Sequence, residues 1–203
     1  MAATRRKLLG SMVGAGALLG LNPGVTAAEE PGAESAAPAG EGLLTMARLR
    51  NYKARRSSSW DRTGGNADSV PVEPGQAVTL LDVHGAGVVT HIWFTIDSRD
   101  PHHLKNLVLR AWWDGEPSPS IEVPIGDFYG LGLGEYFLYQ SALTTVAPQK
   151  ALNAYFKMPF ATAARITLSN EGPERTNSLY YHVDYVTLSA LPGDVGRFHA
   201  QYR

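Results

Sequence analysis

The chain has 203 residues, of which 44% are hydrophobic and 18% charged, as in a typical globular protein. It has no cysteine, which excludes disulfides, thiolate metal sites and cysteine nucleophiles. Without residues 1–27 the 18 basic groups fall to 15 while all 19 acidic groups remain, and a formal charge of −4 argues against nucleic acid and anionic membranes as partners.

The first residues have the pattern of an export signal. The adjacent pair Arg5 and Arg6 precedes an apolar run over residues 8–21, and small residues follow at positions 25–27. This run is shorter than the ~20 residues that span a bilayer, so an anchor is not favoured. We predict a twin-arginine-like export signal over residues 1–27 and a protein exported to the cell envelope or the extracellular space. No membrane contact is expected after the signal is removed.

The next segments are predicted to be a linker, a helix and a loop. Residues 28–41 contain Pro, Ala, Glu and Ser but no large apolar side chain, which is typical of a disordered linker. Residues 43–52 have apolar positions spaced for one short helix. Residues 54–69 have no hydrophobic period and are rich in Ser, Gly, Asn and Asp, which predicts a loop.

From residue 76 onward, short β-branched and aromatic runs alternate with turn residues. Strands are predicted at residues 77–82, 88–96, 106–113, 121–124, 151–157, 164–169, 179–188 and 196–202. The dipeptide Asp114-Gly115 is a strong hairpin signal between two of them. Strands at this spacing with almost no helix predict an all-β fold, a jelly-roll β-sandwich over residues 42–203.

The strand at residues 88–96 is expected to have two different faces. Four apolar residues are predicted to share one face: Val88, Ile92, Phe94 and Ile96. His91 and Trp93 lie on the other face, because successive side chains of a strand point in opposite directions.

The candidate ligand-binding residues lie in two polar segments and on this strand. The segment 59–68 combines two glycines, which permit a tight backbone reversal, with several hydrogen-bonding side chains. Its candidates are Asp61, Arg62, Asn66 and Asp68. The glycine-flanked loop 126–130 adds Asp127 and Tyr129, and the strand adds Trp93. Aspartate and aromatic side chains held between strands suit a polar ligand such as a sugar. The alternative is structural, with loops that satisfy their own hydrogen bonds through Asp–Arg pairing or an Asx turn.

Other acidic residues give weaker signals. Asp114 and Glu116 flank the hairpin tip, where solvated charge is the usual state. Asp184 shares a strand face with Tyr180 and His182, so it is either a buried polar partner or a site residue.

The histidines and glycines predict no metal and no cofactor. His91 lies in a strand, where a histidine that is hydrogen-bonded in the core is the usual case. Adjacent His102 and His103 point apart and suit a solvated loop better than a metal site. The glycine-rich run 130–134 is not followed by Lys and Ser or Thr, which argues against a phosphate loop.

Several of these segments together resemble one family. The matching stretches are residues 59–68 (SWDRTGGNAD), 90–95 (THIWFT), 113–116 (WDGE), 122–130 (EVPIGDFYG), 152–160 (LNAYFKMPF), 180–185 (YYHVDY) and 198–203 (FHAQYR). In this order they resemble the family once called domain of unknown function 2961, now grouped with glycoside hydrolase family 172. The resemblance covers about residues 43–203.

The resemblance implies a double jelly roll and an α-fructofuranosidase or α-arabinofuranosidase type of activity. It also implies a trimer-based homo-oligomer and a carbohydrate ligand. The catalytic glutamates of that family lie in the second jelly roll, in Gly-Glu-Gly-Asp-like and Gly-Thr-Glu-Asp-Tyr-like motifs that do not occur here. We therefore predict no catalytic residue and expect a chain truncated at its C-terminus, the first half of a double jelly roll that is inactive alone. The alternative is a non-catalytic carbohydrate-binding or assembly module.

Overall fold

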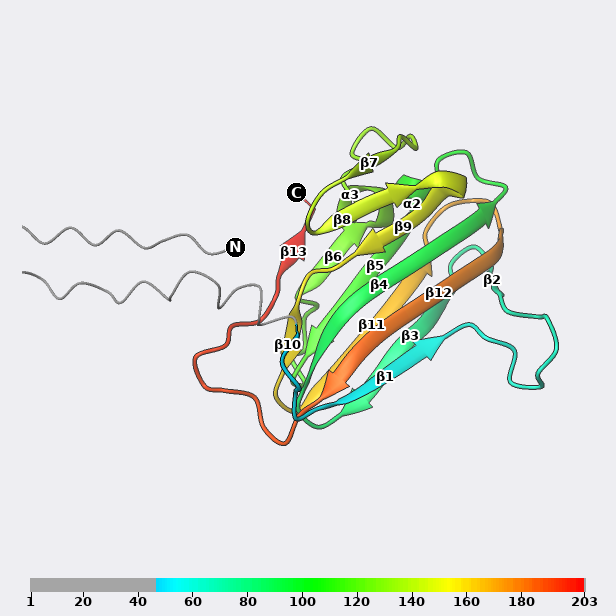
Figure 1. Cartoon of the computed structure of the whole chain (residues 1–203). Coiled ribbons are helices and arrows are strands. Elements are labelled where there is room, and N and C mark those ends of the chain that lie inside the picture. The colour runs from blue at the N-terminus through cyan, green and yellow to red at the C-terminus, as the bar shows by residue number, and fades with distance from the viewer. Residues whose placement is uncertain (1–46, 203) are drawn as a thin grey trace, which may run out of the picture. The chain divides into compact units, whose positions relative to one another are not determined.

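The computed structural model describes residues 47–202, which fold almost entirely into strands (Figure 1). The predicted export signal, the linker and the first part of the predicted helix lie outside the described residues. The strands form one eight-stranded and one five-stranded sheet. The predicted all-β sandwich is confirmed, while the jelly-roll connectivity and the place in a double jelly roll remain predictions.

The large sheet has the strand order β1-β12-β4-β9-β8-β7, with β2 added beside β12 and β10 beside β4. Its strands are β1 (Lys53–Ser58), β2 (Val70–Val72), β4 (Gly87–Ser98), β7 (Tyr139–Gln140), β8 (Thr144–Ala147), β9 (Ala151–Ala154), β10 (Met158–Phe160) and β12 (Thr176–Thr187). The long antiparallel pair β4 and β12 forms its centre. All of these pairings are antiparallel.

The small sheet has the order β13-β6-β5-β11-β3. Its strands are β3 (Ala77–His84), β5 (Leu107–Trp113), β6 (Ile121–Pro124), β11 (Ala163–Asn170) and β13 (Ala200–Gln201). Three short helices join strands: α2 (His103–Asn106), α3 (Ile125–Phe128) and the 3-10 turn η1 (Pro148–Lys150). Within residues 47–202, no helix is long and apolar enough to cross a membrane.

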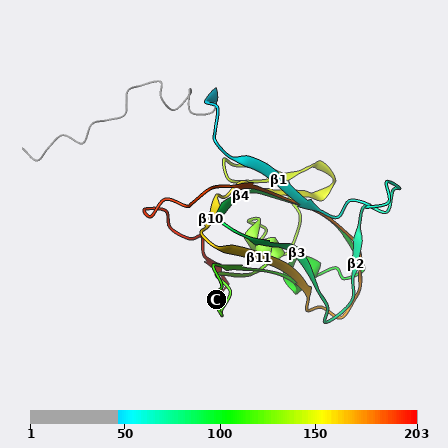
Figure 2. The ribbon, with the colours of Figure 1, turned by 90° about the horizontal axis from the view of Figure 1, so that it is seen from below.

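The two sheets pack face to face around one core. Figure 2 shows β1 and β4 in one layer, with β3 and β11 in the layer below. The core takes Phe94 and Val183 from the large sheet and Leu109 and Ile166 from the small sheet, all fully buried. The inner positions alternate with outward-facing ones, so each sheet has a face that is not part of this core.

The predicted faces of the strand at residues 88–96 are confirmed for most of its length. Ile92, Phe94 and Ile96 are buried, whereas His91 and Trp93 lie on the outer face. Val88 is the exception. The pairing of β4 with β12 shifts between Asp184 and Tyr185, so this bulge turns Val89 inward and Val88 outward.

The bounds of five predicted segments are wrong. Residues 48–52 of the predicted helix are not helical and lead directly into β1, and the predicted loop at 54–69 contains most of β1. β1 is a basic edge strand without hydrophobic alternation, so only its pairing with β12 defines it. The strand predicted at 151–157 ends at Ala154 as β9, and the one at 196–202 is reduced to β13. The start of the predicted loop 126–130 is helical in α3.

Candidate functional site

The outer face of the large sheet carries most of the polar and aromatic side chains that could form a site. We call this surface the open face, and it consists of Arg56 on β1, His91 and Trp93 on β4, Asn153 and Tyr155 on and after β9, and Tyr180, His182 and Asp184 on β12. On β12 these residues alternate with Leu179, Tyr181 and Val183, which are buried. The alternation explains why polar and aromatic groups from four segments share one surface.

Asp184 lies at the centre of a charged network on the open face. Its Oδ1 accepts a hydrogen bond from Arg56 Nε at 2.6 Å, and its Oδ2 accepts one from Arg56 Nη2 at 2.9 Å. His91 Nδ1 lies 3.1 Å from the same Oδ2. Burial raises the pKa of the Asp184 carboxyl, but the bonds from Arg56 and His91 outweigh it and lower the pKa. Two roles were predicted for Asp184, a buried polar partner or a site residue. In the structure Asp184 is hydrogen-bonded to Arg56 and His91, but it lies on an accessible surface and is not in the core.

His91 is held from three sides. Its Nδ1 faces Asp184, and its Nε2 lies 3.2 Å from Asn153 Oδ1. The ring stacks on Tyr155, with centroids 4.7 Å apart and planes 9° from parallel. His91 is hydrogen-bonded as predicted, but on the open face rather than in the core.

Trp93 lies beside His91 on β4 and packs against His182. The two ring centroids are 4.7 Å apart and the planes differ by 32°. Burial lowers the pKa of His182, and the charge of Arg56 lowers it further. A neutral His182 ring and the indole of Trp93 therefore form an aromatic pair beside the charged network.

The segment 59–68 largely satisfies its own hydrogen bonds. Asp61 Oδ1 accepts bonds from the amide and hydroxyl of Thr63, and its Oδ2 accepts one from the amide of Ala67. Asp68 Oδ1 accepts a bond from the amide of Asp61 at 2.8 Å. The bonds from Thr63 and from the Ala67 amide lower the pKa of the Asp61 carboxyl. The carboxylates therefore shape the loop, as the structural alternative predicted, but mainly through hydrogen bonds from the backbone and not through Asp–Arg pairing.

The same segment borders the open face and presents an aromatic side chain. The amide of Ser59 donates to the carbonyl of Tyr181 at 3.2 Å, and Ser59 Oγ accepts from the Tyr181 amide. Trp60 is 51% exposed, and the guanidinium of Arg62 lies 4.9 Å from the centre of its ring. Arg62 and the exposed Asn66 remain candidate ligand contacts at this border.

Asp127 and Tyr129 have structural partners. Both oxygens of Asp127 accept hydrogen bonds from Lys105 Nζ at 2.8 Å. Tyr129 is fully buried, and its hydroxyl donates to the carbonyl of Ile92 at 3.1 Å. Its side chain cannot reach a ligand, so that prediction for Tyr129 is wrong.

The predicted candidates thus lie in three places, and the structure does not bring them together. Trp93 is on the open face, the segment 59–68 borders it, and Asp127 pairs with Lys105 at α3. The sequence pattern missed Arg56, Asn153 and Tyr155 as neighbours of Trp93. The alternations Asn153-x-Tyr155 and His91-x-Trp93 could have indicated that these side chains share a strand face. Arg56 lies on β1, whose sequence has no alternating pattern.

Asp114 is the second correction, because it is not a solvated charge at a hairpin tip. Its Oδ1 accepts bonds from the amides of Ala161 and Thr162 at 2.7 Å each, and its Oδ2 accepts one from Arg197 Nε at 2.5 Å. Burial raises the pKa of this carboxyl, but the bonds from the Thr162 amide and Arg197 outweigh it and lower the pKa. Asp114 therefore ties the hairpin to two other segments, while Glu116 is exposed as predicted.

We expect Asp114 to make the fold sensitive to acid. A lowered pKa means that its contribution is fully present above the ordinary aspartate pKa of about 3.9 and is lost as the pH falls toward the lowered value. Asp114→Asn should reduce the free energy of unfolding by about 1–2 kcal/mol at neutral pH and by less in acid. Urea denaturation at several pH values measures both.

The exposed Asp194, whose side chain has no hydrogen-bond partner among residues 47–202, provides the control Asp194→Asn. Asp61 and Asp184 keep their own acid dependence in both variants, so only the difference between the two variants reports on Asp114. Parallel stability curves for Asp114→Asn and Asp194→Asn would contradict the assignment.

Comparison with known proteins relates the chain to one family. A family model described as GH172 domain-like matches residues 63–183, more than half of the chain. A search of curated proteins found no match. One solved structure that matches is titled "Structure of infectious bursal disease virus Gx strain", with 10% identity and a TM-score of 0.32. The alignment covers 68% of this chain and 33% of that chain. A TM-score this low supports no argument about fold or function.

Proposed function

Since the chain belongs to the GH172 domain-like family, we propose that it is the sugar-binding part of an exported glycoside hydrolase of the α-fructofuranosidase or α-arabinofuranosidase type. In this proposal the open face contacts the sugar, and the catalytic carboxyl groups are not among residues 47–202. Membership of the family suggests that the ligand is a sugar, and the open face is the surface that we propose to contact it.

The arrangement of rings and polar groups on the open face carries this proposal. Sugars present hydroxyl groups at their edges and weakly apolar C–H groups on their faces. The pair Trp93–His182 offers ring surface, while Asn153 and Tyr180 offer hydrogen-bonding groups within the same sheet. The ion pair between Arg56 and Asp184 fixes the polar side of this surface. Few polar groups placed around aromatic rings are typical of a ligand site.

Four aspartates of the described residues are poorly suited to hydrolysis. A glycosidase needs two facing carboxyls, one of them a general acid with a raised pKa. Asp61, Asp114 and Asp184 all have lowered pKa values and are hydrogen-bonded to structural partners. Asp127 is held by Lys105. These contacts support binding without cleavage by this part of the protein.

Trp93→Ala is expected to weaken the binding of difructose anhydride about tenfold, which corresponds to the loss of ~1.4 kcal/mol of ring contact. Calorimetric titration of the purified chain measures the change. Trp112→Ala is the matched control, because Trp112 is also partly exposed but lies on β5 of the other sheet, beside Arg165. The chain alone should not hydrolyse difructose anhydride or an aryl α-arabinofuranoside.

Two results would overturn parts of this proposal. Equal affinity losses in Trp93→Ala and Trp112→Ala would remove the open face as the sugar site. Turnover by the chain alone that Asp127→Asn abolishes would show that a catalytic carboxyl is present here.

A further inference from the structure

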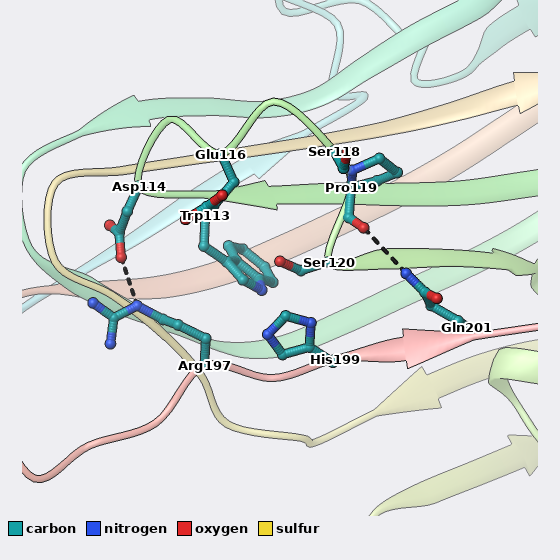
Figure 3. Close-up of a pocket in the computed structure, with 9 residues that line it drawn as sticks. All are labelled: Trp113, Asp114, Glu116, Ser118, Pro119, Ser120, Arg197, His199 and Gln201. Atoms are coloured by element: carbon teal, nitrogen blue, oxygen red, sulfur yellow. Dashed lines mark hydrogen bonds and ion pairs between the residues drawn. The ribbon is translucent and has the colours of Figure 1, made fainter.

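A cleft lies on the side of the small sheet where the hairpin after β5 meets the C-terminal segment (Figure 3). Its volume is about 320 Å³. Six of its lining residues matter for the argument: Trp113, Asp114, Glu116, Ser120, Arg197 and His199. None of them belongs to the open face or to the segment 59–68.

The walls of this cleft are fixed to each other. At one end Asp114 pairs with Arg197, and at the other Gln201 Nε2 donates to the carbonyl of Pro119, as Figure 3 shows. Between them, Trp113 Nε1 donates to the carbonyl of Phe198 at 2.8 Å. Because β13 is parallel to β6 and bonded to it, the C-terminal segment is held as a wall rather than a loose end. The cleft is therefore preformed.

Three of these six side chains have no hydrogen-bond partner among residues 47–202. Ser120 is only 5% exposed, yet its hydroxyl makes no hydrogen bond within the described part of the chain. In Figure 3 that hydroxyl lies on the side of the Trp113 indole, with the His199 ring below it. The His199 ring and the Glu116 carboxylate are also unbonded. No side-chain oxygen or nitrogen of the described residues is both fully buried and without a partner, so the Ser120 hydroxyl opens onto the cleft and is available to a ligand there.

The charges around the cleft select a neutral ligand. Asp114 and Arg197 neutralise each other. A small anion would meet the Glu116 carboxylate, and a cation would meet the Arg197 guanidinium. The other polar groups of the cleft are hydrogen-bond donors and acceptors that lie beside the edge of the Trp113 indole. Such groups match the hydroxyl groups of a small sugar ring. The volume lies at the lower end of the range for small-molecule sites, about 300–1,000 Å³.

We propose that this cleft binds a single neutral sugar unit, separately from the open face. Ser120 and His199 exchange hydrogen bonds with its hydroxyls, and the Glu116 carboxylate accepts one. The ligand class rests on the proposed function, whereas the site itself does not. A chain with two sugar-contacting surfaces would hold an oligosaccharide at two points, which raises its overall affinity.

Indole N–H signals in ¹⁵N-correlated spectra of the chain can test both surfaces at once. Trp113 reports on the cleft and Trp93 on the open face. The variants Trp60→Phe, Trp93→Phe and Trp112→Phe assign the four indole signals by elimination. The probes are D-fructose and L-arabinose, titrated separately into the millimolar range. We expect the Trp113 signal to shift along a saturating curve.

Substitutions at the exposed lining residues sharpen this test. Glu116→Gln and His199→Ala should each weaken the effect on Trp113 about 3- to 10-fold, the factor for one hydrogen bond. The matched controls are Glu135→Gln and His102→Ala. Both change exposed residues that lie outside the cleft and whose side chains have no hydrogen-bond partner within residues 47–202. They should leave the titration unchanged.

The outcomes separate this proposal from the proposed function. A stationary Trp113 signal with a shifting Trp93 signal overturns the cleft and leaves the open face standing. The reverse pattern supports the cleft and contradicts the open face. Equal weakening in the lining variants and their controls also overturns the cleft, because it would show that the Trp113 shift is not specific to its side chains.

Discussion

Tyr129→Ala should lower the free energy of unfolding by about 4 kcal/mol, as expected for removal of a large aromatic side chain from a core. Tyr129 is fully buried, and its ring packs edge-on against Phe94 and Phe128, with centroids 6.2 and 5.2 Å away. Burial also raises the pKa of its phenol well above the usual value, so the hydroxyl stays protonated and donates to Ile92. Urea denaturation followed by fluorescence measures the loss.

Tyr129→Phe distinguishes the packing of the ring from the bond of its hydroxyl. It removes only the hydrogen bond to the Ile92 carbonyl and should cost about 1 kcal/mol. This variant should also bind difructose anhydride as the unchanged chain does, since the residue lies in the core. A loss of affinity with unchanged stability would restore Tyr129 as a ligand contact.

Gly126→Ala should reduce stability by about 3 kcal/mol, the upper range for forcing atoms into a packed core. A Cβ at this position would lie 2.8 Å from the carbonyl oxygen of Leu104 and 2.9 Å from its Cβ. The carbonyl belongs to the backbone of α2, so relief would require α2 and α3 to separate. Thermal and urea denaturation of the variant check the expected loss.

Gly132→Ala is the matched control for this close approach. Its added Cβ would lie 3.5 Å from Asp127 Oδ1, an ordinary contact, and its backbone is not in the left-handed region. Its stability should change by less than about 1 kcal/mol. Equal stability of the two variants would show that α2 and α3 can adjust, and that Gly126 is not required for their packing.

The sequence was sufficient to predict the strands with a buried face. β4, β5, β6 and β11 were found within a few residues because their apolar and polar positions alternate or form continuous apolar runs. The turn at Asp114-Gly115 was also predictable, and both residues have positive φ, at 58° and 81°. Local chemistry decides such elements, so a single sequence contains the information.

The other elements depend on partners that are distant in sequence. β1 is basic and exposed along most of its length, and only its register with β12 makes it a strand. Asp114 looked solvated because Ala161, Thr162 and Arg197, which bind it, lie 47 to 83 residues later. Local patterns carry no information about such pairs.

The candidate site shows the same division. Trp93 and Asp184 were recognised as outward-facing or polar residues of strands. Their assembly with Arg56, His91 and Asn153 required the strand order β1-β12-β4-β9, which periodicity does not give. Conversely, Asp127 and Tyr129 were selected because they lie in a glycine-rich segment that was predicted to be a ligand-binding loop. In the structure the glycine at 126 allows the backbone to pack closely against Leu104.

The pairing of β1 with β12 also determines when the open face can form. Arg56 and Asp184 lie 128 residues apart, and β4 needs β12 along most of its length. Long-range pairing of this kind makes folding slow. A long stretch of chain must lose conformational entropy before the stabilising contacts between the strands can form. During synthesis β4 would have its edge unpaired until residue 187 has emerged, a state prone to aggregation. The open face is likewise incomplete until β12 has emerged, because Asp184 and His182 lie on that strand.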